Sequence, residues 1–133
     1  WEPVPQVVDA LNDAFYAAFN AVEPTGKRLL LALDVSGSMG VGRVAGSSLT
    51  PREASAALAL VTARVEAKIQ IVGFTAADAR SWEGGTAMAP LDLSPAMRLD
   101  QAVRSVANLP FGRTDCALPM LYARKIVCAS VRS

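Results

Sequence analysis

Residues 29–40 read LLLALDVSGSMG, an aliphatic run that ends in a carboxylate and two hydroxyls at every second position. The apolar run over residues 28–35 does not alternate with polar residues, which predicts a strand buried on both faces of a parallel sheet. Asp34, Ser36 and Ser38 follow at the carboxyl end of this strand, where open α/β sheets bind their ligands. One stretch therefore predicts both a fold class and the position of a candidate site.

The composition of the chain limits the function classes that need to be considered. It has 133 residues, 52% of them hydrophobic, and a formal net charge of +1, which is typical of one soluble globular domain. No basic block predicts a nucleic-acid surface, and Arg28, Arg43, Arg52 and Arg64 are interpreted as scattered surface charges. The chain has no histidine, which excludes Ser-His-Asp and Cys-His catalytic groups and histidine-ligated zinc within it.

Targeting signals and cysteine usage predict a cytoplasmic location. No apolar run reaches the length of a membrane span, and the first residues do not resemble a signal peptide. Cys116 and Cys128 have no metal-ligand spacing and lie among apolar residues, so they are interpreted as buried free thiols. We therefore expect a reduced, cytoplasmic protein without membrane contact.

The hydrophobic pattern outside the opening stretch predicts alternating helices and strands. Thr50, Pro51 and Glu53 combine an N-cap, a first-turn proline and a capping-box glutamate. The apolar face of the helix that follows is predicted to be Ala54, Ala57, Leu58, Val61 and Val65. Further helices are expected over residues 4–22, 97–109 and 115–124, and strands over 68–75, 87–93 (an edge strand after a Gly84-Gly85 turn) and 125–131. This order predicts an α/β domain with a mostly parallel central sheet flanked by helices.

Asp34, Ser36 and Ser38 are the candidate ligands of a divalent cation. Alternate positions of an extended chain project to the same side, so the three oxygen groups should converge, with Gly37 leaving the turn unobstructed. One carboxylate and two hydroxyls form an oxygen-only set, which suits Mg²⁺ as the preferred ion, with Mn²⁺ or Ca²⁺ as alternatives. The competing interpretation is a strand-to-helix turn capped by Asp and Ser.

Enzymatic alternatives fit the same stretch less well. The glycines of residues 40–46 have the wrong spacing for a dinucleotide-binding loop, and no Walker A lysine or G-x-S-x-G elbow is present. An aspartyl phosphatase would place a second carboxylate two residues after Asp34, where Ser36 stands. No base or nucleophile accompanies the predicted cation ligands, so the chain is not expected to be an enzyme.

Four blocks of the sequence together resemble a known family. DVSGSM matches the D-x-S-x-S motif of the metal-ion-dependent adhesion site (MIDAS) in von Willebrand factor A (vWA) domains. VEPTGKRLLLALDVSGSM, REASAALALVTAR, IVGFT and RTDCALPM resemble the C-terminal vWA domain of the Ro 60 kDa autoantigen (TROVE-domain) family, over residues 4–123. The resemblance implies a Rossmann-like vWA fold over residues 25–133, preceded in residues 1–24 by a linker helix from a helical-repeat TROVE domain.

The resemblance also implies a second ligand loop. The family's threonine ligand corresponds to Thr114, whose alternative role is that of a helix N-cap. Asp115 is interpreted as a helix-start charge, and Arg113 replaces a glycine that is usual in the family. The family's third motif is an aspartate, yet no acidic residue follows Asp115. Because no turn residue separates the helical pattern from the strand pattern, a segment is expected to be missing near residues 122–126.

The resemblance implies a function in RNA metabolism. It implies that the chain is a divalent-cation-binding module of a Ro-like ribonucleoprotein. That ribonucleoprotein would bind small noncoding Y RNA and misfolded small RNAs in RNA quality control or processing. RNA would bind the whole protein rather than this domain alone, and an acidic protein ligand would complete the coordination of the metal. The alternative is a structural or protein-interaction domain with a vestigial metal site.

Overall fold

The computed structural model describes residues 2–76, 87–107, 109 and 112–130. Three strands, four α-helices and two 3-10 turns (η) follow one another along the described chain. They are α1 (Pro5–Ala17), η1 (Ala18–Ala21), β1 (Leu29–Asp34), η2 (Gly37–Gly40), α2 (Pro51–Val65), β2 (Ile69–Phe74), β3 (Met88–Pro90), α4 (Leu99–Ala107) and α5 (Leu118–Ser130). The Gly84-Gly85 turn expected before the edge strand lies outside these residues.

The sheet has the order β1-β2-β3. β1 and β2 are parallel, in a register that runs from Leu29 beside Ile69 to Asp34 beside Phe74. A parallel pair needs a crossover connection, and α2 supplies it. β3 pairs antiparallel with β2 at the far edge from β1, so the described sheet is mixed. The α/β prediction and the edge strand are confirmed.

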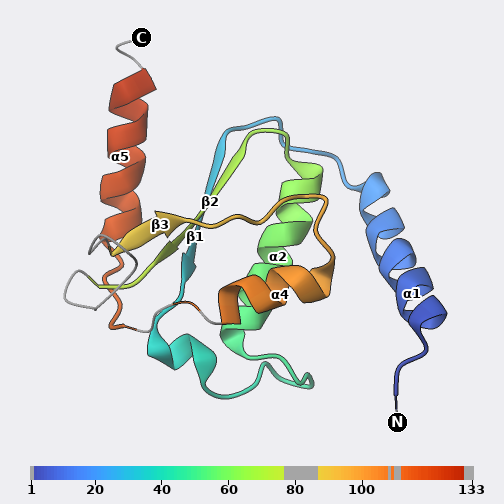
Figure 1. Ribbon diagram of the computed structural model, residues 1–133. Coiled ribbons are helices and arrows are strands. Elements are labelled where there is room, and N and C mark those ends of the chain that lie inside the picture. Colours follow the sequence, from blue (N-terminus) through green and yellow to red (C-terminus); the bar gives the residue numbers. More distant parts are fainter. Residues whose placement is uncertain (1, 77–86, 108, 110–111, 131–133) are drawn as a thin grey trace.

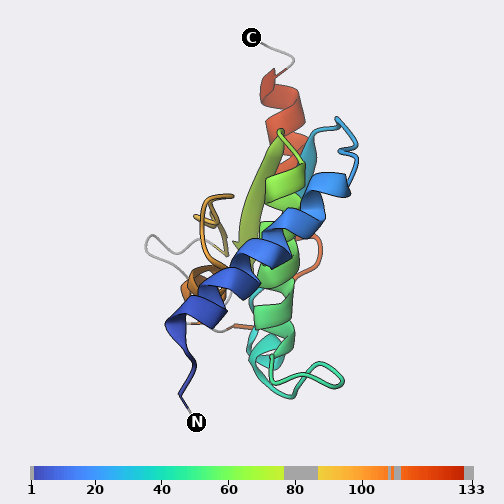
Figure 2. The same cartoon turned by 90° about the vertical axis from the view of Figure 1, so that its right-hand side faces the viewer.

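Helices cover both faces of this sheet. α2 and α4 lie on one face and α5 lies on the other (Figure 1), while α1 crosses the outer side of α2 (Figure 2). The core fills the space between the β1–β2 pair and the helices α2 and α4. Its buried members are Leu33, Val35, Ala56, Ala59, Leu60, Ala63, Ile71, Leu93, Ala102 and Val106. Asp34 therefore stands at the carboxyl end of a strand that is fixed by packing.

The start of α2 agrees with its sequence signals. The Oγ1 of Thr50 accepts a hydrogen bond from the Glu53 N–H (3.3 Å), and the Glu53 carboxylate accepts one from the Thr50 N–H (2.7 Å). These two bonds form the predicted capping box. The bond from the Thr50 N–H also holds the pKa of Glu53 below its usual value.

Replacing Thr50 with alanine is expected to lower the free energy of unfolding by about 1 kcal/mol, because an N–H at the start of α2 loses its acceptor. Chemical denaturation measures this loss. Thr62→Ala is the matched control on the same helix, since the Thr62 hydroxyl only bonds back to the Leu58 carbonyl. An equal loss in the two variants would show that the capping box contributes nothing specific.

The predicted apolar face of α2 is wrong. The residues that α2 buries are Arg52, Ala56, Ala59, Leu60 and Ala63, whereas Leu58 is 69% exposed. The predicted face and the observed buried face are offset by two residues, which corresponds to a rotation of about 200° around the helix axis. Alanines lie on both sides of α2, so the sequence pattern did not distinguish the sides. Arg52, interpreted as a surface charge, is only 2% exposed.

The end of the chain also differs from the prediction. α5 begins at Leu118 and continues to Ser130, so the strand expected over residues 125–131 is wrong as far as the structure describes it. Pro119 lies in the first turn, where a missing N–H costs no helical hydrogen bond. α5 runs through residues 122–126 without a turn, and the segment expected to be missing there stays a prediction.

The leading helix is held to the domain by polar contacts. The helix predicted over residues 4–22 is present as α1 and η1, and none of its residues is buried. Arg98 forms an ion pair with Asp9, and the Tyr16 hydroxyl donates to the Met97 carbonyl (3.1 Å). The guanidinium of Arg64 lies 3.2 Å above the Tyr16 ring. The proposed origin of residues 1–24 in a preceding domain stays a prediction.

The structure also bears on membrane-spanning helices and on the two cysteines. Among the described residues, no helix has the length and apolar character needed to cross a membrane. Cys116 is exposed, so its interpretation as a buried thiol is wrong. The side chain of Cys128 lies outside the part that the structure describes.

Candidate metal centre

The first part of the site is the turn that ends β1. Asp34 is the last residue of the strand, and its Oδ1 accepts a hydrogen bond from the Ser36 N–H (2.8 Å). This bond fixes the carboxylate against its own backbone and leaves Oδ2 directed elsewhere. Ser36 is 2% exposed, so the hydroxyl next to the carboxylate is almost enclosed by protein.

Ser38 reaches the same place by a different geometry from the one predicted. The chain is extended only as far as Ser36, and the residues of η2 then form a 3-10 turn. Within this turn the Ser38 Oγ lies 3.2 Å from the Ser36 Oγ. The predicted convergence of the two hydroxyls is present, but a turn produces it rather than alternation along an extended strand.

The second part of the site is the loop before α5. The Gly112 carbonyl accepts a hydrogen bond from the Gly37 N–H (3.1 Å), which joins this loop to the first turn. The Thr114 Oγ1 donates to Asp34 Oδ2 at 3.4 Å. The structure thus brings Thr114 to the carboxylate of the first motif, although 80 residues separate them in the chain.

Asp115 has the role expected of a residue at a helix start. Its Oδ1 accepts a hydrogen bond from the Ala117 N–H (2.9 Å), just before α5 begins, and its own N–H bonds to the Thr75 carbonyl (3.2 Å). Asp115, rather than Thr114, therefore supplies the side-chain acceptor just before α5. In this loop the Thr114 hydroxyl points to Asp34.

Arg52 is the residue at this site that the sequence reasoning missed. It lies in the first turn of α2 and donates from Nη2 to the carbonyls of Val35 and Ser36, the latter at 2.9 Å. Its Nη1 donates to the Leu109 carbonyl at 3.4 Å. Burial lowers the pKa of Arg52, and the nearby Asp34 carboxylate opposes this effect. An arginine just after a helix N-cap carries no sequence signal of this role.

The four side chains together form a hard-oxygen donor set. The Ser36 and Ser38 hydroxyls form one pair (3.2 Å), and the Thr114 hydroxyl forms another with Asp34 Oδ2 (3.4 Å). The Ser36 N–H joins the two pairs by donating to Asp34 Oδ1 (2.8 Å). Ser38 and Thr114 are exposed, which leaves this set open to solvent on one side. In the described ranges no group of three or more His, Cys, Asp or Glu side chains forms a metal cluster. The donor set therefore fits Mg²⁺, Mn²⁺ or Ca²⁺ and does not fit zinc.

Known relatives match almost the whole chain. The family model described as the Ro60 vWA domain matches residues 28–127. The chain belongs to the Ro60 vWA domain family. It is 44% identical over 124 residues to the RNA-binding protein RO60 of Deinococcus radiodurans, covering 92% of this chain and 22% of that protein. It is 42% identical over 123 residues to the RNA-binding protein RO60 of Caenorhabditis elegans, covering 92% and 17%.

A solved structure gives the same relationship for the fold. The crystal structure of the Deinococcus radiodurans Ro protein matches with a TM-score of 0.70 and 45% identity, over 92% of this chain and 23% of that one. The vWA fold predicted from the D-x-S-x-S stretch is therefore confirmed. This Ro60 vWA chain spans about a fifth of the length of the relatives that it matches.

Gly37 of the Ro60 vWA domain lies between the two serines, and the structure assigns it no steric role. Its φ is not in the left-handed region, and a Cβ at this position would meet no atom within 4 Å. We expect Gly37→Ala to change the melting temperature by less than about 2 °C, because neither strain nor overlap arises and the N–H to Gly112 is kept. Differential scanning calorimetry measures this shift. A larger loss would mean that the turn needs glycine.

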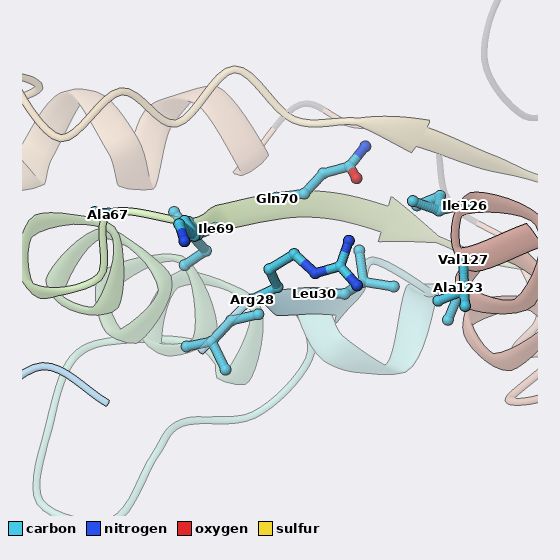
Figure 3. A pocket seen from close by; sticks show the side chains of 10 residues that line it. Arg28, Leu30, Ala67, Ile69, Gln70, Ala123, Ile126 and Val127 are labelled. Carbon is cyan, nitrogen blue, oxygen red and sulfur yellow. The ribbon is translucent and has the colours of Figure 1, made fainter. Parts of the chain in front are cut away.

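The Ro60 vWA domain also has an apolar groove of about 450 Å³. The groove lies between the amino ends of β1 and β2 on one side and α5 on the other (Figure 3). Arg28, Leu30 and Ile69 line the strand side, and Ile126 and Val127 line the α5 side. The six residues of β1 span roughly 17 Å from Leu29 to Asp34. The groove and the candidate metal centre are therefore at opposite ends of the strand and are separate features.

Proposed function

We propose that this chain is the divalent-cation-binding module of a Ro-type RNA-binding ribonucleoprotein. The observation that carries the proposal is the meeting of Asp34, Ser36 and Ser38 with Thr114, which comes from a distant loop, in a member of the Ro60 vWA family. Mg²⁺ is the preferred ion, because every donor is a hard oxygen.

The charge of this donor set favours an acidic partner. Asp34 would be the only negative ligand of a divalent ion, so a bound cation would keep an excess of positive charge. The exposed sides of Ser38 and Thr114 would leave coordination positions open to solvent. A carboxylate from a protein ligand would supply both the missing charge and a further hard oxygen. We propose such an acidic ligand as the partner of the module.

In this proposal the whole protein, rather than this chain alone, binds RNA. The relatives are named RNA-binding proteins, and this chain spans about a fifth of their length. We propose that the complete protein binds Y RNA and misfolded small RNAs in the cytoplasm, for RNA quality control or processing. With a net charge of +1, the 133-residue chain alone should bind RNA weakly.

We do not propose an enzymatic activity. General acid-base catalysis at a metal needs a further group that is free to move a proton. Asp34 would be occupied as a ligand, and the Asp115 carboxylate is bonded at the start of α5. The module would bind and present a cation rather than use it for hydrolysis.

A Mn²⁺ titration followed by electron paramagnetic resonance tests the cation proposal. We expect one site per chain, with a dissociation constant on the order of 10⁻⁴ to 10⁻³ M because only one ligand is charged, and competition by Mg²⁺. A synthetic acidic peptide should tighten binding of the ion. If no saturable site is found at millimolar Mn²⁺, the domain is structural and its metal site is vestigial.

A further inference from the structure

Arg52 combines a full positive charge with almost complete burial. It is 2% exposed, although it lies in the first turn of α2, directly after Thr50 and Pro51. Burying a guanidinium is unfavourable unless its N–H groups find acceptors that replace water. The position of its hydrogen bonds therefore indicates what this arginine does in the fold.

The acceptors of Arg52 lie in the first ligand turn and at Leu109, just after α4 and five residues before Thr114 in the chain. Nη2 donates to the carbonyls of Val35 and Ser36, the two residues that follow Asp34. Nη1 donates to the carbonyl of Leu109, on the segment that leads to Gly112 and Thr114. One planar group thus joins the first ligand turn to Leu109, on the chain that leads from α4 towards Thr114.

The geometry of a guanidinium is suited to this task. Its N–H groups form a rigid fork, so fixing one carbonyl also fixes the direction of the next bond. A lysine ammonium is a point charge on a flexible stem and does not hold two loops at a set angle. The hydrogen bond from the Gly37 N–H to the Gly112 carbonyl (3.1 Å) is the second tie between the same loops. We expect this hydrogen bond between Gly37 and Gly112 to persist only while the Arg52 guanidinium holds the first ligand turn.

We propose that Arg52 is a positioning residue that holds the two ligand loops of the metal centre together before a cation binds. The inference concerns how the site is prepared, and its effect on affinity rests on the proposed cation binding. Groups behind the ligands of a metal site commonly change metal affinity 10- to 100-fold when they are replaced.

Two measurements on Arg52→Lys test this role. Hydrogen exchange of the Gly37 amide, without metal, should become at least about 10-fold faster, while amides in the middle of α2 keep their protection. Mn²⁺ affinity should fall at least about 10-fold. Arg64→Lys is the matched control, because Arg64 is on the same helix but contacts Met97 and Tyr16. Both properties should be unchanged in that variant.

A measurement on the wild-type protein does not depend on the variant being folded. The Nη signals of Arg52 should be resolved and slow to exchange in nitrogen NMR without cation, because its N–H groups are held by carbonyls. Free rotation of this guanidinium in the metal-free protein would overturn the inference. So would a folded Arg52→Lys variant with wild-type exchange at Gly37 or with wild-type Mn²⁺ affinity.

The outcomes also separate this inference from the proposed function. If the wild-type chain binds no Mn²⁺, the proposed cation binding fails, and the exchange of Gly37 alone decides whether Arg52 holds the loops. If the wild-type chain binds Mn²⁺ and Arg52→Lys binds it equally, the cation proposal stands and the positioning role is wrong.

Discussion

Asp34→Asn is expected to weaken Mn²⁺ binding by at least about 100-fold, which corresponds to about 2.8 kcal/mol of binding free energy. Asparagine has nearly the same shape, and its Oδ1 can still accept the hydrogen bond from the Ser36 N–H. The substitution removes the only charged ligand of the proposed set, so the attraction to a divalent ion falls most at this position. The fold should persist, because the turn keeps its hydrogen bond.

The matched control for this prediction is Asp115→Asn. Asp115 is the neighbour of Thr114, but its carboxylate accepts from the Ala117 N–H at the start of α5. Mn²⁺ titration of both variants, with circular dichroism to confirm folding, should show loss of binding in Asp34→Asn alone. Equal losses would indicate a general effect of negative charge near the loops. Wild-type binding by Asp34→Asn would contradict the assigned ligand set.

Leu60→Ala is expected to lower the free energy of unfolding by about 3 kcal/mol, within the range of 2–5 kcal/mol typical of buried leucines. Leu60 is 0% exposed and belongs to the core cluster with Leu33, Ile71 and Val106. The truncation removes buried methyl groups and leaves a cavity between α2 and the sheet, which the rigid strands cannot close. Urea denaturation measures the loss.

Leu58→Ala is the control for the core prediction, since it makes the same chemical change two residues earlier on α2. Leu58 is 69% exposed, so its truncation should change the free energy of unfolding by less than about 0.5 kcal/mol. This pair of variants also decides which face of the helix is internal. A larger effect at Leu58 than at Leu60 would restore the face that the sequence pattern favoured.

The features that the sequence predicted well are local ones. Thr50 and Glu53 lie three residues apart, and their capping box needs only the first turn of α2 to form. The aliphatic run of β1 predicted a strand, and the glycine and serine residues that follow predicted a turn. Asp34 and Ser36 meet because they belong to the same turn. These contacts depend on neighbouring residues and on backbone geometry.

The features that the sequence missed depend on distant partners. The side of α2 that becomes internal is chosen by packing against β1 and α4, because small apolar residues lie on both sides of the helix. The pattern of residues 125–131 predicted a strand, yet α5 continues through the described part of them to Ser130, because no breaker interrupts its hydrogen bonds. Local preference alone did not choose between these states.

The sequence by itself therefore determined the α/β class, the place of the carboxylate at the end of β1 and the membership in the Ro60 vWA family. The resemblance predicted that Thr114 joins Asp34, but only the tertiary structure showed the contact between them and the burial of Arg52 behind the first ligand turn. The physical reason is that a hydrogen bond between loops requires the sheet and its crossover helix to be in place. Sequence spacing carries no information about that distance.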